Sequence, residues 1–432
     1  MRFDTVDEWL RWQQGLHTAQ IDLGLQRLVE PFRRLAIDFS KTVVFTVAGT
    51  NGKGSCVAFL SAILQQAGYR VGSYTSPHLF SYSERIRIDN VCIPDADLCQ
   101  SFAAVDEARK QTTITYFEFA TLAALDYFNT QKCDVLVLEV GLGGRLDAVN
   151  IVDPDVAIIT NISLDHTDWL GDSREDIALE KSGILREKGI LVCGEKLPPQ
   201  TLLRRVRELN VNAYFINDAF HYRPHGESWC LQIGSLDFPT LPLPNLIGDF
   251  QILNAATAIT ALAQIPDKVQ ICSHHIETAL NTVRLAGRFQ MLSHKPDRIV
   301  DVAHNVGAAE TLVKELTSHR PNSGVRHAVF ALQTHKDVDA IIAATVTHIT
   351  VWHLAPLLEV ASVPVSEIET LINKYDSLYN HVSRIKVYSS ITDAWCAADQ
   401  LLNSADDVLL GFGSFYTVSE ILLFEQKMRI IL

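Results

Sequence analysis

A short glycine-rich segment between a strand and a helix constrains the fold of this chain most strongly. Residues 42–48 (T-V-V-F-T-V-A) are apolar on both faces, as buried parallel strands are, and they run directly into G-T-N-G-K-G-S at 49–55. Glycines let backbone amides turn toward a phosphate, Lys53 supplies a mobile cation, and Ser55 supplies a hydroxyl ligand for Mg²⁺. We therefore predict a phosphate-binding loop, shorter than the general G-x-x-x-x-G-K-[ST] form. A glycine turn that only packs a helix on a sheet is the alternative.

The rest of the chain alternates short apolar strands with helical patterns. In the first part, the strands are expected at 42–48, 134–140 and 155–162, and helices at 53–67 and 117–129. This order predicts an α/β fold with a P-loop mononucleotide-binding domain built on a central, mainly parallel sheet. The aromatic, Gly- and Pro-rich segment 210–245 is predicted to be an irregular or antiparallel patch of this domain.

Beyond about residue 290 the alternation restarts and predicts a smaller, Rossmann-like C-terminal α/β domain. We place the domains at 1–287 and 288–432, with a hinge near 284–296 about which the domains are expected to close. The predicted strands of the second domain are 298–303, 326–332, 349–354, 384–388 and 407–411, and its predicted helices are 306–318, 338–346, 366–374, 391–402 and 416–427.

Length, charge and cysteine content exclude several classes of protein. The chain has 432 residues, of which 47% are hydrophobic, so two or three folded domains are expected. Its net charge of −13 argues against a general electrostatic hold on nucleic acid or an anionic membrane. Its eight cysteines contain no C-x-x-C pair, and no segment reads as a signal peptide or membrane span. We predict a cytoplasmic protein with reduced thiols.

Two strand ends carry candidate metal ligands. Glu139 ends strand 134–140, and His166 follows strand 155–162. Because ligands gather at the carboxyl ends of strands in a doubly wound sheet, both side chains are expected near a nucleotide Mg²⁺. A loop-capping acid and a structural histidine are the alternatives.

Lys181 and Ser76 are ambiguous from their local sequence. Lys181 lies in E-K-S-G-I within a helix-like stretch, where a solvated helix position is the more common outcome. Ser76 lies in T-S-P-H-L after a short strand at 71–74, where a turn serine before proline is equally plausible.

Taken together, the motifs resemble those of the folylpolyglutamate synthase and dihydrofolate synthase family, a branch of the ATP-dependent Mur-type amide ligases. They span nearly the whole chain in family order. The motifs are A-G-T-N-G-K-G-S (48–55), T-S-P-H-L (75–79), Y-F-E-F (116–119), E-V-G-L-G-G-R-L-D-A-V-N (139–150), L-D-H-T-D-W-L-G (164–171), E-K-S-G-I (180–184), A-G-R-F-Q (286–290), D-V-A-H-N (301–305) and G-S-F (413–415).

The resemblance implies a site for ATP and for Mg²⁺, with two metal ions and a possible monovalent cation. The implied ATP-binding residues are Asn51, Gly52, Lys53, Gly54, Ser55, Asn254, Arg288 and Asp301. The implied metal ligands are Ser55, Ser76, Glu139, His166 and Lys181, the last as a carbamate. A carbamate would convert the lysine cation into the oxygen ligand that Mg²⁺ prefers. Lys53, Lys181 and His304 are the implied catalytic residues, with His304 near the transferred phosphoryl group.

The resemblance also implies a dihydropteroate site, which points to the bifunctional bacterial type of enzyme. The matching residues are Asp22, Leu23, Tyr116, Phe117, Glu118, Phe119, Leu146, Asp147 and Ala148. Phe117 and Phe119 are candidates for stacking on the flat pterin ring, although alternating aromatic residues are as often part of a core.

Three positions depart from the family pattern. His335 stands where an acid is common, Val306 where proline is common, and Phe412 where a small residue is common. These departures bear on glutamate binding and on the second domain more than on the phosphate loop.

The implied reaction is the ATP-dependent addition of L-glutamate to dihydropteroate and to the γ-carboxylate of reduced folates through an acyl phosphate. Small molecules would be the only partners, with no nucleic acid and no membrane, and the protein is expected to be a monomer. A cell-wall Mur-type ligase is the alternative enzyme, but we expect no room for its usual additional amino-terminal domain before the strand at 42. A non-catalytic ATP-binding homologue is the alternative from another class.

Overall fold

The structure is a computed structural model that describes residues 2–19, 21–319 and 324–431, except for the side chains of 429–431. It forms two compact units, which are described separately. Unit 1 comprises Met1–Ser163, Leu170–Asn245 and Gln251–Arg284, and unit 2 comprises Leu164–Trp169, Leu246–Phe250 and Leu285–Leu432. The predicted boundary after residue 287 differs from this division by three residues. The two short segments of unit 2 were predicted to lie in the first domain.

Unit 1 is built on an eight-stranded sheet with the order β4-β3-β2-β5-β1-β6-β7-β8. The strands are β1 (Val43–Ala48), β2 (Val71–Tyr74), β3 (Ile86–Ile88), β4 (Val91–Cys92), β5 (Val135–Glu139), β6 (Val156–Ile159), β7 (Ile190–Cys193) and β8 (Asn212–Phe215). The strand β1 is parallel to both β5 and β6, whereas β3 and β4 are antiparallel additions at one edge. The predicted central, mainly parallel sheet is confirmed.

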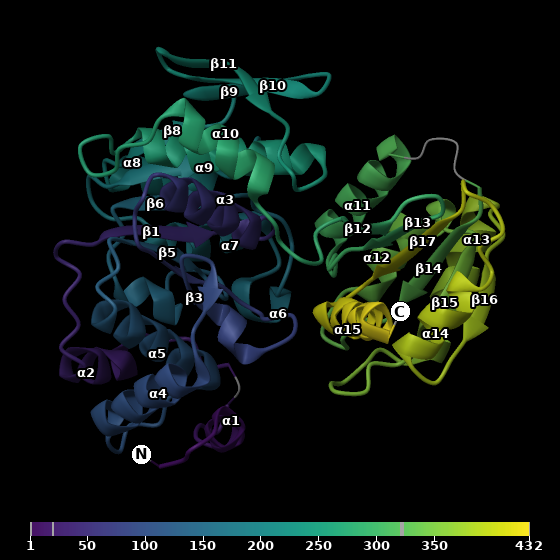
Figure 1. The fold of residues 1–432 in the computed structure, drawn as a ribbon, viewed down its shortest axis with the longest axis horizontal. Helices are drawn as coiled ribbons and strands as arrows, with labels where there is room; N and C mark the ends of the chain where they lie inside the picture. The colour runs from purple at the N-terminus through teal and green to yellow at the C-terminus, as the bar shows by residue number, and fades with distance from the viewer. Residues whose placement is uncertain (1, 20, 320–323, 432) are drawn as a thin grey trace. The chain divides into compact units, whose positions relative to one another are not determined.

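Helices cover both faces of this sheet because β1 and β5 are buried along almost their whole length. The group α1, α2, α4 and α5 packs together, and α3 packs against α10 (Figure 1). The helices are α1 (Val6–Gln14), α2 (Gln26–Arg34), α3 (Lys53–Gln66), α4 (Asp95–Arg109), α5 (Tyr116–Thr130), α7 (Arg174–Lys181), α8 (Gln200–Glu208), α9 (Asp249–Ala263) and α10 (Ser273–Thr282), with 3-10 turns η1 (Tyr82–Arg85), η2 (Ala148–Ile151) and η3 (Ser182–Ile184). Helix α6 (Thr167–Leu170), apart from its last residue, and the start of α9 lie in the short segments of unit 2.

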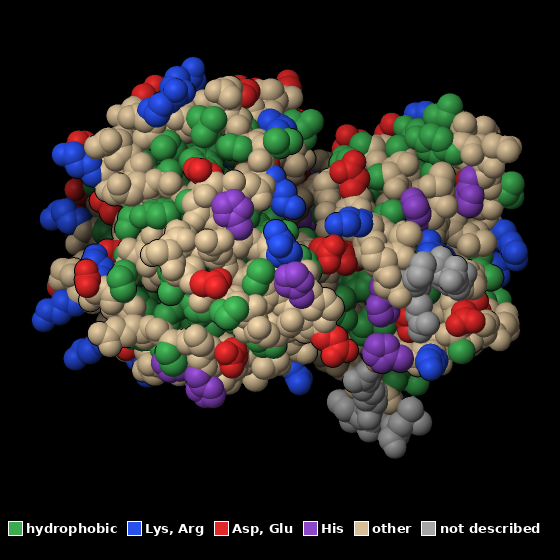
Figure 2. Space-filling view, turned by 90° about the horizontal axis from the view of Figure 1, so that it is seen from above, with side chains coloured by type: hydrophobic (Ala, Val, Ile, Leu, Met, Phe, Trp, Pro, Cys, Tyr) green, Lys and Arg blue, Asp and Glu red, His purple; other side chains and the backbone are tan. Residues whose placement is uncertain are grey.

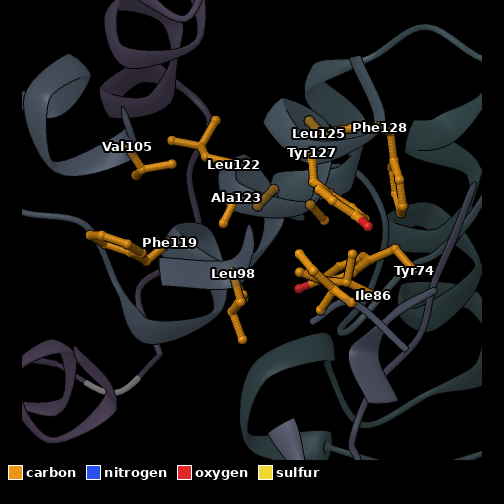
Figure 3. Close-up of a cluster of buried hydrophobic side chains, with 14 of the residues drawn as sticks. Tyr74, Ile86, Leu98, Val105, Phe119, Leu122, Ala123, Leu125, Tyr127 and Phe128 are labelled. Atoms are coloured by element: carbon orange, nitrogen blue, oxygen red, sulfur yellow. The ribbon is translucent and has the colours of Figure 1, made fainter. Parts of the chain in front are cut away.

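One hydrophobic core of unit 1 lies between α4, α5 and the strands β2 and β3. Figure 3 shows Phe119, Leu122 and Phe128 of α5 in the same cluster as Tyr74 of β2 and Ile86 of β3. All five side chains are fully buried. A separate antiparallel sheet of β9 (Phe220–His225), β10 (Ser228–Ile233) and β11 (Leu236–Pro242) confirms the antiparallel patch predicted within 210–245.

Unit 2 contains a six-stranded sheet with the order β12-β13-β17-β14-β15-β16, parallel except for the edge strand β12. Its helices α11 to α15 alternate with the strands, as the sequence predicted. Its elements are β12 (Gln290–Ser293), β13 (Asp297–Val300), α11 (Val306–His319), β14 (Arg326–Phe330), α12 (Val338–Thr345), η4 (Val346–His348), β15 (Val351–Leu354), α13 (Val365–Tyr379), β16 (Arg384–Val387), α14 (Ile391–Asp399), β17 (Val408–Phe412) and α15 (Phe415–Ile431).

No helix in the described part of the chain combines the length and the apolar character that a membrane span requires. All eight cysteines are free in the structure. On the face drawn in Figure 2, acidic and basic side chains are interspersed on both units, so this face carries no extended basic surface for a polyanion.

Candidate functional site

The glycine loop leaves β1 at Ala48 and enters α3 at Lys53, and residues after β6 hold it in shape. The backbone N–H of Thr50 donates to the carbonyl of Asn161 at 3.0 Å, and the backbone N–H of Asn51 donates to Asn161 Oδ1 at 2.8 Å. Thr160 Oγ1 donates to the Asn51 carbonyl at 2.6 Å. The sequence prediction did not include Thr160 and Asn161, although a polar pair directly after a buried strand was the available signal.

Asn254, on α9, lies against the loop at Gly52. Gly52 has φ +83°, and a Cβ at this position would lie 2.6 Å from Asn254 Oδ1. Only glycine adopts this backbone conformation readily and leaves room for the amide. The structure therefore brings together two predicted ATP-binding residues that are far apart in the sequence.

Ser55 lies in the first turn of α3 with Lys53 and Gly54. Its side chain is buried, and its Oγ has no hydrogen-bond partner among the described residues. A buried hydroxyl without a partner is costly unless a ligand satisfies it. A Mg²⁺ ion is a suitable ligand because it prefers oxygen donors, so the residues present fit the implied metal.

Lys53 and Lys181 converge on one backbone atom. Lys53 Nζ donates to the carbonyl oxygen of Gly49 at 3.1 Å, and Lys181 Nζ donates to the same oxygen at 2.9 Å. Lys181 ends α7 and is only 3% exposed. The expectation that Lys181 occupies a solvated position on its helix, the more common outcome for such a sequence, is therefore wrong.

Glu139 and Ser76 meet at the carboxyl ends of β5 and β2. The backbone N–H of Ser76 donates to Glu139 Oε2 at 3.1 Å, and the Glu139 side chain is buried. Because β5 lies beside β1, Glu139 ends the strand next to the one that leads into the glycine loop. The structure thus brings Glu139 to the sheet edge that the sequence predicted.

The loop after β5 packs against the end of α7. A Cβ on Gly144 would lie 3.1 Å from Lys181 Cα, so the close approach requires glycine. Asp147 accepts hydrogen bonds from the backbone N–H groups of Leu142 and Val149, and burial raises its pKa to about 6. Leu146 is half-buried, and Ala148 is buried at the start of η2.

The two candidate stacking residues differ in their surroundings. Phe119 is completely buried and packs against Trp9, Trp12 and Phe102 at ring-centroid distances of 5.6–6.3 Å. The structure gives Phe119 a core role instead of an open stacking face. Phe117 is half-buried, and its ring contacts the backbone at Gly141. Its neighbour Tyr116 is also half-buried.

The remaining predicted pteroate-binding residues also differ in exposure. The Glu118 side chain is 5% exposed and bonds to Arg27, which the sequence prediction missed. Asp22 is 42% exposed and bonds to the same arginine, whereas Leu23 is half-buried. No local motif marked Arg27, because its buried partner Glu118 is 91 residues away in the sequence.

His166 belongs to unit 2, whereas the other predicted metal ligands belong to unit 1. Its backbone is left-handed, with φ +53°, and the preceding Asp165 accepts hydrogen bonds from Lys336 Nζ at 2.8 Å and Asn305 Nδ2 at 2.9 Å. Burial alone would raise the pKa of Asp165. The nearby positive charge of Lys336, together with the charges that His166 and His304 carry when protonated, instead holds this pKa well below its usual range.

The second unit also contains His304, Arg288 and Asp301. His304 Nδ1 donates to the carbonyl of Val302 at 2.7 Å, which leaves Nε2 as the acceptor of the neutral ring. Burial, reinforced by Lys336, lowers its pKa to about 4. Asp301 accepts from the backbone N–H groups of Phe289 and Ala303, and burial raises its pKa against the opposing charge of Arg288.

The three departures from the family pattern lie in unit 2, in different surroundings. The His335 ring lies 6.3 Å from that of His166, nearly parallel to it. Val306 takes the first position of α11, where proline is favoured because its missing N–H is not needed and its φ is already helical. Phe412 is buried in the second core, 4.8 Å from the ring of Phe330.

Among the described residues, no three His, Cys, Asp or Glu side chains form a cluster suited to a metal. The candidate metal site therefore depends on hydroxyl oxygens and on Lys181 as well as on Glu139.

Comparison with known proteins yields matches over nearly the whole chain. Residues 47–262 match the Mur ligase middle domain, and residues 287–415 match the Mur ligase, glutamate ligase domain. The dihydrofolate synthase/folylpolyglutamate synthase of Escherichia coli K12 is 38% identical over 96% of this chain and 94% of its own.

Two solved structures share the fold. The Escherichia coli FolC structure in complex with DHPP and ADP has a TM-score of 0.92 and 37% identity, and the match covers 99% of both chains. The Yersinia pestis bifunctional folylpolyglutamate synthase/dihydrofolate synthase complexed with AMPPNP and Mn ion has a TM-score of 0.88 and 38% identity, with 98% of both chains covered.

Proposed function

This chain belongs to the dihydrofolate synthase/folylpolyglutamate synthase family of ATP-dependent ligases, and from that premise we propose how its residues divide the work. The reaction adds L-glutamate to dihydropteroate and to the γ-carboxylate of folates through an acyl phosphate. The observation that supports this assignment most directly is the buried Ser55 Oγ, which has no hydrogen-bond partner among the described residues; it lies beside the glycine loop, where Lys53 and Lys181 also meet.

The first task is to hold ATP. We assign the triphosphate to the backbone of Asn51, Gly52 and Gly54 and to the Lys53 ammonium, because these groups surround the turn into α3. Asn254, Arg288 and Asp301 complete the proposed ATP-binding residues. Lys53 neutralises charge as the γ-phosphoryl group moves to the substrate carboxylate.

We propose that the site binds a divalent cation, that this cation is Mg²⁺, and that two ions bind. The residues that would hold them are Ser55, Ser76, Glu139, His166 and Lys181. When bound, it supplies positive charge that neutralises phosphate oxygens. The related structure with Mn and AMPPNP supports the use of a divalent ion in this family. Mg²⁺ itself, the second ion and a monovalent cation are parts of our proposal.

Lys181 suits conversion to a carbamate for an electrostatic reason. Its ammonium and that of Lys53 both donate to the Gly49 carbonyl, so two like charges lie close together in a buried place. The Lys181 ammonium would first lose a proton to solvent; its neutral amine would then form an N–C bond with CO₂ and release a second proton, so that a carbamate anion replaces one of these cations. The Lys53 charge would then be stabilised, and the metal would gain an oxygen ligand.

Glutamate attacks the acyl phosphate through its α-amine, and the tetrahedral intermediate collapses to an amide and phosphate. We propose that His304 lies near the transferred phosphoryl group. Because its Nδ1 donates to the Val302 carbonyl and its pKa is lowered to about 4, the ring is neutral at pH 7 and its Nε2 can accept a proton.

Dihydropteroate is assigned to Asp22, Leu23, Tyr116, Phe117, Leu146, Asp147 and Ala148. The protein is proposed to act as a cytoplasmic monomer.

The direct test supplies dihydropteroate and tetrahydrofolate separately, each with ATP, Mg²⁺ and labelled L-glutamate, and identifies the products by mass spectrometry. We expect one glutamate to be added to each acceptor, with stoichiometric ADP and phosphate. Reactions without ATP are the negative control. ATP binding without labelled product from either acceptor would instead identify a non-catalytic homologue.

A further inference from the structure

One arginine ties the loop between α1 and α2 to the start of α5. Arg27, in the first turn of α2, donates from Nε to both carboxylate oxygens of Glu118 at 2.8 and 2.9 Å. Its Nη1 donates to Asp22 Oδ2 at 2.5 Å, and its Nη2 donates to the Asp22 carbonyl. The guanidinium therefore joins two parts of the proposed pteroate site that are far apart in the sequence.

The Glu118 carboxylate is directed inward. Its side chain is 5% exposed, and it accepts a hydrogen bond from the backbone N–H of Thr115 at 2.7 Å in addition to those from Arg27. Thr115 in turn caps α5 by accepting from the backbone N–H of Glu118. Because donors of the protein surround this carboxylate, Glu118 is poorly suited to bind the substrate directly.

Asp22 is arranged differently. Its side chain is 42% exposed, and Oδ2 is shared by Arg27 and by His17 Nε2 at 3.1 Å. His17 is itself fixed by Thr113 Oγ1, 3.0 Å from Nδ1. Within the described part of the chain, Oδ1 of Asp22 has no hydrogen-bond partner. Asp22 is thus held from one side and presents one oxygen on the other.

We propose that Arg27 is a positioning residue for the pteroate site, and that it holds Asp22 so that Oδ1 accepts hydrogen bonds from the N–H edge of the pterin ring. This inference rests on the proposed function. The 2-amino-4-oxopyrimidine edge of a pterin carries adjacent N–H donors, and the single carboxylate oxygen Oδ1 of Asp22 is a suitable acceptor for them. Fixing Asp22 in advance lowers the entropy cost of ordering the loop when the substrate binds.

The planar fork of arginine is required for this role. Arg27 binds the Glu118 carboxylate through Nε and Nη2 and the Asp22 carboxylate through Nη1, whereas a lysine ammonium is a single point charge on a flexible stem. Lysine at this position should therefore preserve the charge but only part of the positioning.

The test compares Arg27→Met, Arg27→Lys, Glu118→Gln and the double variant Arg27→Met/Glu118→Gln. We expect Arg27→Met to raise the KM for dihydropteroate about 10- to 100-fold, the range for a lost charge-assisted hydrogen bond, with little change in kcat or in the KM for ATP. Arg27→Lys should be intermediate. The double variant should be no worse than Arg27→Met, because both changes break the same link.

Arg33→Met is the matched control. Arg33 lies on the same helix, is 71% exposed and pairs only with Glu30 among the described acids. Hydrogen exchange of the segment 15–25 should become faster in Arg27→Met and stay unchanged in Arg33→Met.

Three results would overturn the inference. These are an unchanged KM for dihydropteroate in Arg27→Met and Glu118→Gln, a parallel loss of ATP binding, or unaltered exchange of the 15–25 segment. If Arg27→Met does not fold, the isosteric Glu118→Gln variant carries the test. Absence of product from dihydropteroate with the wild-type enzyme would instead refute the proposed function itself.

Discussion

The glycine loop of unit 1 and the sheet of unit 2 differ in whether their buried polar side chains find hydrogen-bond partners within the protein. At the loop, Ser55 Oγ is buried without a partner in the described chain, and two lysines meet at one carbonyl. In the second sheet, His327 Nδ1 lies 3.0 Å from His353 Nε2, and His353 Nδ1 lies 3.1 Å from the hydroxyl of Tyr388. The first arrangement needs a ligand, whereas the second is complete within the protein.

An unpartnered buried atom alone does not mark a site. Trp352 Nε1, in the second sheet, is also buried and has no partner among the described residues. Ser55 differs because a strand end, a glycine loop and a helix N-terminus surround it with groups that bind anions and cations. The comparison therefore predicts that substitutions at the loop change activity, whereas substitutions in the histidine pair change stability.

The largest effect is expected for Lys53→Ala. Loss of the cation that neutralises the transferred phosphoryl group should lower kcat/KM by about 10³-fold or more, measured as glutamate-dependent phosphate release. Lys188→Ala is a suitable control because Lys188 is 73% exposed and pairs with Glu187. Near-normal turnover of Lys53→Ala would refute the phosphate-loop assignment.

Lys181→Ala should lower the rate about 10²-fold, because a proposed oxygen ligand is lost. If Lys181 acts as a carbamate, acetate should restore part of the activity by supplying a carboxylate in the same space. Sodium chloride at equal ionic strength is the control for a general salt effect. Full activity of Lys181→Ala without acetate would remove the carbamate from the mechanism.

The sequence predicted the loop better than the pteroate segments, for a physical reason. Gly52, Lys53 and Ser55 are neighbours in the chain, so a local motif contains most of their geometry. Strand periodicity also predicted where Glu139 would lie, because the carboxyl ends of parallel strands share one edge. Resemblance, not periodicity, suggested a role for Lys181, and its burial became visible only in the structure.

The pteroate segments depend on packing between distant parts of the chain. Phe117 and Phe119 alternate in sequence, yet one contacts the loop at Gly141 and the other lies in the core. The positions of α1 and α4 decide this difference, and no local pattern records them. The same reason hid Arg27, whose role depends on Glu118.

A smaller effect on activity is expected for Ser55→Ala. It should raise the Mg²⁺ concentration needed for half-maximal activity about tenfold, while the free energy of unfolding without ligands changes by less than about 1 kcal/mol, since no hydrogen bond is lost. Ser61→Ala is a matched control, because Ser61 lies on the same helix and its buried Oγ is also without a partner in the described chain. Equal Mg²⁺ dependence in the two variants would contradict the comparison at its central residue.

The smallest effect is expected for His353→Gln, and it should appear in stability alone. Burial, reinforced by His327, lowers the pKa of His353 to about 3, whereas an unfolded histidine has a pKa near 6.5. As the pH falls below 6.5, the unfolded state therefore binds a proton that the native state does not, and stability is lost. Between pH 6.5 and 5.5 this single group should cost about 1 kcal/mol in the free energy of unfolding.

Glutamine retains a donor and an acceptor but does not titrate, so urea unfolding of His353→Gln at these two pH values should lack that increment, with glutamate ligation unchanged. His294→Gln is the control, because His294 is 69% exposed and lies outside the pair. An unaltered pH dependence in His353→Gln would mean that His353 has the same pKa in the native and unfolded states, as an exposed histidine does. The contrast between a complete buried network and an incomplete one would then fail for unit 2.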